Sequence, residues 1–362
     1  RVSGSEIISS NSKTSYNGNY GLNASWTLYN GNKRLKTIQQ EKLNNQVAEL
    51  DVATSENNIQ ESIAQVYIQI LYAAESVKVN ESTLQVSIAQ RDRGQELLNA
   101  GSIAKSDFPQ LEAQVSTDRY QLVTAQATLE DYKLQLKQLL ELDGENEMNI
   151  YLPALSDENV LAPLPTKKDV YISALSLRPE IEASKLNVEA SELGIGIAKS
   201  SYLPTISLSA GIGTNHTSGS DFTFGEQVKN GWNNSIGLSV SVPIFNNRQT
   251  KSAVQKAKLQ YETSMLSLLD EQKTLYKTIE GLWLDANSAQ QRYAAANEKL
   301  KSTQISYELI SEQFNLGMKN TIELLTEKNN LLQAQQEQLQ AKYMAILNTQ
   351  LLKFYQGDQL AI

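Results

Sequence analysis

An internal duplication constrains the fold of this chain more than any other feature of its sequence. The matched positions all lie 216 residues apart: Leu28-Tyr29-Asn30-Gly31 with Ile244-Phe245-Asn246-Asn247, Tyr67 with Trp283, and Glu96, Asn99 and Gly101 with Glu312, Asn315 and Gly317. One offset held along about 70 residues indicates two structural copies, because unrelated helices would drift out of register.

The duplication predicts how the chain is divided. Residues 1–142 form the first copy, residues 143–177 a proline-containing linker with a short helix at Lys168–Leu177, residues 178–356 the second copy, and residues 357–362 a C-terminal tail. The second copy begins near Arg178 with a helix and a strand. The same elements of the first copy would lie ahead of Arg1, so we expect roughly 40 further residues there. The segment Ser3-Gly4-Ser5-Glu6 also resembles Ser218-Gly219-Ser220-Asp221.

Three segments, residues 20–28, 205–213 and 236–244, alternate between apolar and small polar residues. This period of two is typical of β-strands, and it places Leu22 and Trp26 on one face and Asn23 and Ser25 on the other. Each segment is about the 9–11 residues that a tilted strand needs to cross a bilayer. The aromatic residues near the ends suit a membrane-interface girdle: Tyr16, Tyr29, Trp232 and Phe245.

A soluble antiparallel sheet with one wet face would show the same alternation. The polar face favours the membrane alternative, because its residues are small and uncharged whereas soluble sheets usually present Lys or Glu outward. Open strand edges are not tolerated in lipid. The chain supplies three strands and a fourth expected ahead of Arg1, fewer than the roughly eight that close a barrel. We therefore expect three copies to build one barrel of about twelve strands.

Two very long helices are predicted, at Lys33–Leu98 and Gln249–Phe314. Neither range contains proline, and Ile63, Ile70, Val77 and Leu84 recur every seven residues, which is a coiled-coil pattern. At 1.5 Å per residue each helix would be roughly 100 Å long.

Each long helix ends at an Asn-x-Gly sequence, Asn99-Ala100-Gly101 or Asn315-Leu316-Gly317. Glycine suits the left-handed conformation that closes a helix. A return helix is predicted after each tip, at Ser106–Leu142 and Thr321–Phe354, with Ser106 and Thr321 as the N-caps. The expected fold class is therefore mostly α, with two coiled-coil hairpins and a β portion.

Composition excludes several classes of function. The chain has no cysteine, four methionines and a single histidine, His216, so we predict no catalytic triad, no thiolate nucleophile, no metal site and no cofactor. We expect His216 in an exposed loop. The formal net charge of −8 argues against a nucleic-acid partner, which requires clustered Lys and Arg. No apolar run approaches the roughly 18 residues of a membrane-spanning helix.

The order of strand, long helix, glycine tip and return helix, present twice, resembles the TolC-type outer-membrane efflux protein family. Local motifs agree with this resemblance: Leu177-Arg178-Pro179-Glu180-Ile181, Tyr202-Leu203-Pro204, and the two tips at residues 99–107 and 315–323. The resemblance implies a homotrimer with a twelve-stranded β-barrel in outer-membrane lipid and an α-helical tunnel across the periplasm. It implies a passive exit duct for efflux or type I secretion that works with a periplasmic adaptor and an inner-membrane transporter, and not an enzyme.

The resemblance also implies that the tips hold the gate and the adaptor-binding surface. The gate residues implied are Asp107 and Glu323 as acids, Phe314 as the aromatic residue and Lys319 as the cation. The adaptor-binding residues implied are Gly101, Ser102, Ile103, Ala104, Gly317, Met318 and Asn320. The sequence departs from the family pattern, because position 323 is Glu instead of Asp, Thr326 stands where a second acid is expected, and Phe314 has no hydroxyl group.

Two alternatives stay open at this stage. Asp107 and Glu323 could be solvated charges that interact with the dipoles of the helices they begin. The whole chain could be a periplasmic coiled-coil adaptor or scaffold, which would account for the heptads. Such a protein would have one hairpin, no lipid-facing strands and a soluble monomeric state.

Overall fold

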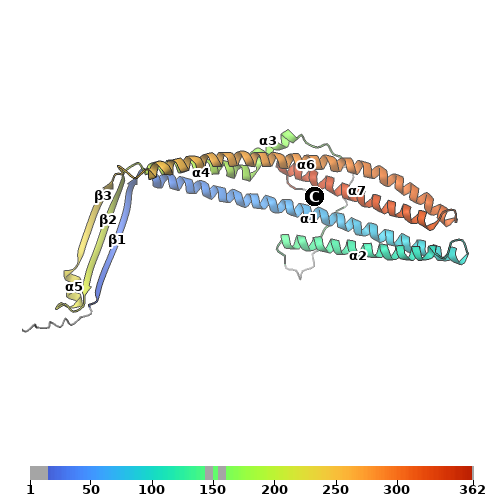
Figure 1. The fold of residues 1–362 in the computed structure, drawn as a ribbon, viewed down its shortest axis with the longest axis horizontal. Coiled ribbons are helices and arrows are strands. Elements are labelled where there is room, and N and C mark those ends of the chain that lie inside the picture. The colour runs from blue at the N-terminus through green and yellow to red at the C-terminus, as the bar shows by residue number, and fades with distance from the viewer. Residues whose placement is uncertain (1–14, 143–149, 154–159, 361–362) are drawn as a thin grey trace, which may run out of the picture. The chain divides into compact units, whose positions relative to one another are not determined.

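The computed structural model describes residues 15–142, 150–153 and 160–360 (Figure 1). The elements follow the order β1 (Asn17–Asn30), α1 (Lys33–Asn99), α2 (Asp107–Leu139), α3 (Lys167–Leu177), α4 (Pro179–Ser200), β2 (Thr205–Thr217), α5 (Phe224–Asn230), β3 (Asn233–Ser241), α6 (Gln249–Asn315) and α7 (Thr321–Gln356). The predicted match that involves Ser3-Gly4-Ser5-Glu6 lies outside the described residues.

The chain divides into two compact units, residues 1–46 with 186–266 and residues 47–185 with 267–362. The first unit contains the strands, and the second contains most of the helical hairpins. Each unit combines segments from both predicted copies, so the duplication contributes to both. Of the helices described, none has an apolar stretch long enough to cross a membrane.

The three strands form one antiparallel sheet in the order β1-β2-β3. Residues paired directly across antiparallel strands share a face of the sheet. The register aligns the apolar residues into rows, of which two are Ala24-Ala210-Ile236 and Trp26-Leu208-Leu238. The opposite face consists of small polar residues and glycine, as in the row Ser25-Ser209-Gly237. The period-two prediction is therefore confirmed for the central part of each strand.

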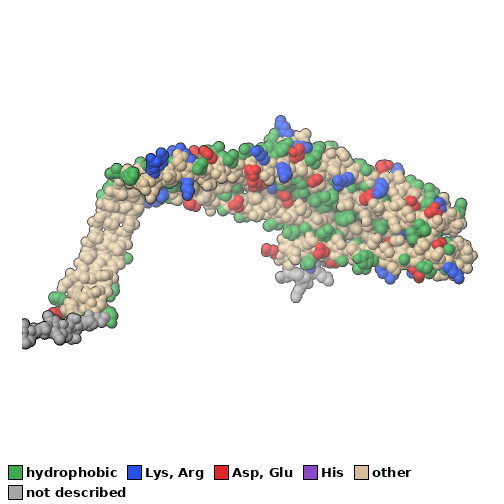
Figure 2. Space-filling model, viewed as in Figure 1, with side chains coloured by type: hydrophobic (Ala, Val, Ile, Leu, Met, Phe, Trp, Pro, Cys, Tyr) green, Lys and Arg blue, Asp and Glu red, His purple; other side chains and the backbone are tan. Residues whose placement is uncertain are grey.

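In the described part of the chain, the central rows of the apolar face are left exposed. Ile236 is 84% exposed and Trp26 is 64% exposed, and Leu22, Leu238 and Val240 are also exposed. A water-soluble sheet normally buries its apolar face against another layer. The three strands contain no Lys, Arg, Asp or Glu, whereas charged side chains are spread over the helices in view (Figure 2).

A β-bulge changes the expected faces at one end of β1. The register shifts between Thr27 and Tyr29, so that Tyr29 pairs with Ile206. Strict alternation would have placed Tyr29 on the small polar face. The extra residue of the bulge returns it to the apolar row instead.

Two further sequence expectations at the strands are corrected. His216 does not lie in a loop, since it belongs to β2 and pairs with Gly18 of β1. The last strand does not reach Ile244, because β3 ends at Ser241. Pro243 follows shortly afterwards and has no N–H to continue a ladder.

The helix predictions are confirmed to within a few residues. Both α1 and α6 have 67 residues, and their first residues, Lys33 and Gln249, keep the offset of the duplication. The short linker helix α3 begins at Lys167, one residue earlier than expected. The return helix α2 ends at Leu139 and α7 extends to Gln356.

The core of the second unit has two large apolar clusters away from the tips. One consists of Val170, Ala174, Ile181, Leu275, Ile279, Ala286, Leu352 and Tyr355. The other joins α1 to α7 through Ala64, Ile68, Leu71, Tyr343, Leu347 and Leu351. These clusters join the linker helix α3 and both long helices to α7.

Arg178 of the Arg-Pro-Glu motif lies beside the first cluster. Its buried guanidinium forms ion pairs with Glu180 at 2.8 Å and with Glu61 at 3.2 Å, and it lies 4.3 Å from the ring centroid of Tyr355. Pro179 follows as the first residue of α4, a position where its missing N–H removes no helical bond. The motif thus begins α4 and ties it to α1 and α7.

Candidate functional site

The two outgoing helices end in the same backbone structure. At the first tip, the Gly101 N–H donates to the Leu98 carbonyl and the Ser102 N–H donates to the Leu97 carbonyl. The equivalent donors at the second tip, Gly317 and Met318, repeat this pattern. Both glycines are left-handed, with φ of 73° and 71°. This is the Schellman arrangement, and it confirms the helix ends predicted from the Asn-x-Gly sequences.

A small apolar core joins the two hairpins directly behind the tips. It consists of Leu97, Leu111, Phe314 and Leu324, one residue from each of α1, α2, α6 and α7. Phe314, expected at the gate, is 1% exposed, so its ring packs inside the chain. A Cβ atom at Gly94 would lie only 2.2 Å from Leu111 Cδ1, so glycine permits the close approach of α1 to α2.

The second tip begins its return helix with a capping box. The Glu323 N–H donates to Asn320 Oδ1 at 2.9 Å, and the Asn320 N–H donates to Glu323 Oε2 at 3.2 Å. The N-cap is therefore Asn320 and not Thr321, which was the sequence prediction. Thr321 is the first helical residue and is buried. An Asn side chain reaches the free N–H groups of the first turn as well as Ser or Thr does.

The first tip lacks this capping box. Ser106 is the N-cap of α2 by position, as predicted, but its side chain makes no capping hydrogen bond. The N3 position is Pro109, which has no N–H to donate. Ala104 occupies the position equivalent to Asn320 and has no acceptor side chain.

The expected gate charges are placed differently at the two tips. Lys319 and Glu323 form an ion pair at 2.6 Å. The Lys319 ammonium group and then the Asn320 N–H hold the pKa of the Glu323 carboxyl below its ordinary value. Asp107 lies in the first turn of α2, with the Ser106 hydroxyl 3.5 Å away. The structure therefore brings Lys319 and Glu323 together on one tip and places Asp107 on the other hairpin.

The residues expected to contact an adaptor are mostly accessible. Met318 is 72% exposed, and Gly101, Ser102, Ala104, Gly317 and Asn320 are also exposed. Ile103 is half-buried and packs against the apolar core behind the tips. These side chains and backbone groups leave a surface of small residues around both turns.

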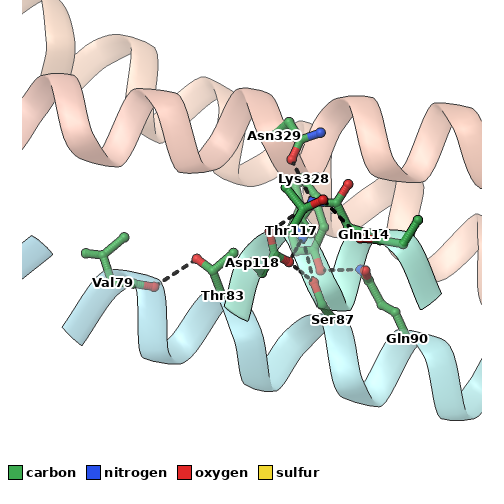
Figure 3. A network of polar contacts seen from close by, with 11 residues as sticks. Val79, Thr83, Ser87, Gln90, Gln114, Thr117, Asp118, Lys328 and Asn329 are labelled. Atoms are coloured by element: carbon green, nitrogen blue, oxygen red, sulfur yellow. Dashed lines mark hydrogen bonds and ion pairs between the residues drawn. The ribbon is translucent and has the colours of Figure 1, made fainter. Parts of the chain in front are cut away.

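A buried polar network connects the hairpins behind the tip core (Figure 3). The Lys328 ammonium group of α7 donates to Asp118 of α2 and, at 2.5 Å, to Ser87 Oγ of α1. Ser87 also donates to Asp118, and Gln114 donates to the second Asp118 oxygen at 2.8 Å. Lys328 is 3% exposed and Asp118 is 1% exposed. Burial lowers the pKa of Lys328, and the contact with Asp118 opposes that shift.

Sequence reasoning missed this network, although a signal was present. Asp118 continues the buried α2 positions Leu111 and Val115, and Lys328 follows the buried Leu324 at helical spacing. A charged residue on the buried face of each of two helices indicates a buried ion pair. Which two residues form the pair depends on how the hairpins pack. Arg93 was also missed: it donates to the Asn315 carbonyl at 3.2 Å and so links α1 to the end of α6.

No group of three or more His, Asp or Glu side chains that could hold a metal ion occurs within residues 15–142, 150–153 and 160–360. The tips combine accessible small residues, a half-buried ion pair and a capping box.

The chain thus combines two matched helical hairpins with a three-stranded sheet whose apolar face is largely exposed. This combination defines the class of protein by its fold. The model of the family described as outer membrane efflux protein matches residues 1–141 and 170–357. Because these ranges cover most of the chain, the protein belongs to the outer membrane efflux protein family. The resemblance noted from the sequence is thereby confirmed.

Curated relatives are identical to this chain at about a quarter of the aligned positions. The outer membrane efflux protein BepC of Brucella suis biovar 1 (strain 1330) is 24% identical over 294 residues, which cover 81% of this chain and 61% of BepC. The outer membrane protein TolC of Escherichia coli (strain K12) is 23% identical over 311 residues, which cover 83% of this chain and 62% of TolC. The chain thus spans less than two thirds of the length of these two relatives.

Solved structures agree with the fold. A crystal structure of CusC matches with a TM-score of 0.81 at 19% identity, covering 98% of this chain and 81% of that one. The outer membrane protein VceC from Vibrio cholerae matches with a TM-score of 0.76 at 15% identity, covering 96% of this chain and 88% of VceC. At these identities the matches establish the fold.

Proposed function

We propose that this chain is one subunit of a homotrimeric outer-membrane duct that crosses the periplasm and serves tripartite efflux or type I secretion. The duct is passive, and a periplasmic adaptor and an inner-membrane transporter act at its tips. The observation that carries the proposal is the sheet, which combines an uncharged sequence with an uncovered apolar face.

Lipid is the environment that suits such a sheet. Moving the exposed side chains of the rows Ala24-Ala210-Ile236 and Trp26-Leu208-Leu238 from water into hydrocarbon would lower the free energy by about 25 cal/mol per Å² of apolar area. In lipid the outer edges of β1 and β3 need partner strands, because unpaired backbone groups there are costly. Three chains with four strands each would close a barrel of about twelve strands, and the membrane girdle is Tyr16, Tyr29, Trp232 and Phe245.

The proposal includes the division of the chain into two copies, residues 1–142 and 178–356. The linker is residues 143–177, and the tail is residues 357–362. The agreement of α1 with α6 in length and offset supports them. In this scheme each copy contributes one hairpin to the tunnel wall, and the linker lies outside it.

The tips form the gate and the adaptor-binding surface in this proposal. Around a three-fold axis, three Glu323 carboxylates and three Asp107 carboxylates would attract cations and repel anions. Lys319 forms an ion pair with Glu323 within each chain and offsets part of this charge. The buried Phe314 serves the gate by fixing the tip core and not by bonding to a neighbouring chain. Gly101, Ser102, Ile103, Ala104, Gly317, Met318 and Asn320 form the adaptor-binding surface.

The oligomeric mass in detergent tests the duct. We expect a trimer that inserts into planar bilayers and conducts ions. A monomer that stays soluble without detergent and does not conduct would contradict the proposal and favour the periplasmic adaptor or scaffold.

Single-channel recording tests the gate. Lys319→Ala removes the cation that is paired with Glu323, so we expect higher conductance and stronger cation selectivity. Lys105→Ala, at an exposed position of the first tip, is the matched control and should leave both unchanged. Equal conductance of the two variants and the unsubstituted protein would remove Lys319 from the gate.

A further inference from the structure

The short helix α5 lies against one particular face of the sheet, at the end where β1 begins (Figure 1). The Phe224 ring is 6.3 Å from the Tyr20 ring, nearly perpendicular to it, and 5.0 Å from the His216 ring. Tyr20 of β1 pairs with Thr214 of β2, and the next pair on the same face is Leu22 with Ile212. Because side chains two apart share a face, α5 covers the continuation of the apolar face and not the small polar face.

Hydrogen bonds hold α5 in this position. Thr223 and Glu226 form a capping box at its start. The Gln227 side chain accepts from the Thr217 N–H at 2.8 Å and donates to the Phe222 carbonyl at 2.8 Å. Thr214 Oγ1 donates to the Val228 carbonyl at 2.9 Å. Both ends of α5 are therefore tied to β2 or to its own cap, so the segment is an ordered part of the unit.

Exposed aromatic residues occur in α5, in the first part of β1 and in the segments next to them. We define the α5 aromatic cap as the exposed residues Tyr16, Tyr20, Phe222, Phe224 and Trp232. Glu226 and Lys229 carry charges within α5, whereas the strands contain no Lys, Arg, Asp or Glu. Aromatic residues collect where hydrocarbon meets polar head groups, because their rings are apolar and their edges tolerate water. The change from charged to uncharged residues thus falls at the aromatic cap.

We propose that the α5 aromatic cap contacts lipid, with α5 lying on the outer surface of the barrel at the level of the lipid head groups. The inference rests on the proposed function, since it requires the apolar face of the sheet to lie in lipid. In this position α5 limits how deeply the strands enter the bilayer, because sinking further would bury Glu226 and Lys229 in hydrocarbon. If α5 lay in the lumen or in free solvent, Phe224 would not meet lipid.

The three tryptophans make the depth measurable by fluorescence quenching. Trp26 lies within the apolar rows, Trp232 belongs to the α5 aromatic cap, and Trp283 lies in α6, where it donates to the Pro165 carbonyl at 3.0 Å. Single-tryptophan variants, made by Trp→Phe at the other two positions, are reconstituted in vesicles of phosphatidylcholine with bromine either near the carbonyls or near the chain ends. A fourth variant carries Phe224→Trp with all three native tryptophans replaced by Phe, and helix content by circular dichroism verifies folding.

We expect Trp26 to be quenched more by deep bromines, Trp232 and Phe224→Trp more by shallow bromines, and Trp283 by neither. If Trp26 is quenched and the Phe224→Trp variant is not, the α5 inference is overturned while the duct stands. If Trp26 itself is not quenched, the sheet is not in lipid and the proposed function fails as well. The variant with native Trp232 keeps Phe224 in place, so shallow quenching there tests the cap even where the Phe224→Trp variant does not fold.

Discussion

The tip at Gly101 and the tip at Gly317 are equivalent by the duplication, and they close their outgoing helices with the same two backbone hydrogen bonds. Their return helices begin differently. At the second tip, Asn320 and Glu323 satisfy each other's N–H groups. At the first tip, Ala104 stands in place of Asn320, and α2 begins at Asp107, two residues later in the repeat than α7.

The comparison shows which parts of a duplicated hairpin vary independently. The turn depends on the backbone and on one left-handed glycine, so it survives changes in the neighbouring side chains. The cap depends on one acceptor side chain and on an available N–H, so the change of a single residue can remove it. The second tip therefore has a side-chain cap that the first tip lacks.

The buried network is also one-sided. Lys328 of the second hairpin bonds to Asp118 and Ser87 of the first. The positions equivalent to Lys328 and Asp118 are Glu112 and Ala334, which cannot form the reciprocal pair. The two hairpins are therefore joined at this level by one ion pair, and its loss cannot be compensated by a symmetric partner.

The largest effect is expected for Lys328→Met, because it leaves the Asp118 carboxylate buried without its cation. Breaking a buried pair from one side costs about 3–5 kcal/mol. The free energy of unfolding, measured in detergent by urea titration with circular dichroism, should fall by that order. The double variant Lys328→Met with Asp118→Leu removes both charges and should recover most of the loss. A single variant as stable as the unsubstituted protein would show that the pair does not hold the hairpins together.

Asn320→Ala should have the next largest effect, because it places at the second tip the residue that stands at the equivalent position of the first, Ala104. Loss of an N-cap costs about 1 kcal/mol, and hydrogen exchange should accelerate at the amides of residues 321–324. The first tip serves as the internal reference, because α2 begins there without a side-chain cap, so exchange at residues 105–108 should not change. Unchanged exchange at residues 321–324 would mean that capping does not explain the difference between the tips.

The smallest effect is expected when the pH is lowered, and it should occur at the second tip, where Glu323 forms the capping box. The lowered pKa of Glu323 in the folded protein, caused first by Lys319 and then by the Asn320 N–H, means that its ionised form stabilises the second tip. This contribution is present above the pKa of an unfolded Glu and is lost as pH falls through the lower folded pKa. Amide protection at residues 321–324, corrected for intrinsic exchange, should therefore decrease on acidification.

Glu323→Gln is the control for this pH dependence, because it keeps the shape of the side chain and removes its charge. The variant should show protection that no longer varies over the same pH range. A pH dependence that persists in Glu323→Gln would assign the effect to another carboxyl group.

The sequence predicted features that depend on local regularity. The duplication gave the length and offset of α1 and α6, the alternation gave the apolar rows of the sheet, and the glycines gave the turns. It failed where local patterns compete: Asn320, not Thr321, caps α7, and His216 lies in β2 instead of a loop. Both failures involve a single residue whose partner lies across a turn or a strand.

What the sequence determined by itself is therefore the set of elements and their periodicity, because helix and strand geometry repeat from residue to residue. Only the tertiary structure decided that Lys328 meets Asp118 and Ser87, that Phe314 faces inward, and that α5 covers the apolar side of the strands. These contacts join residues that are distant in the chain, and their distances depend on how the hairpins and strands pack. A buried charge or ring acquires its partner only at that stage.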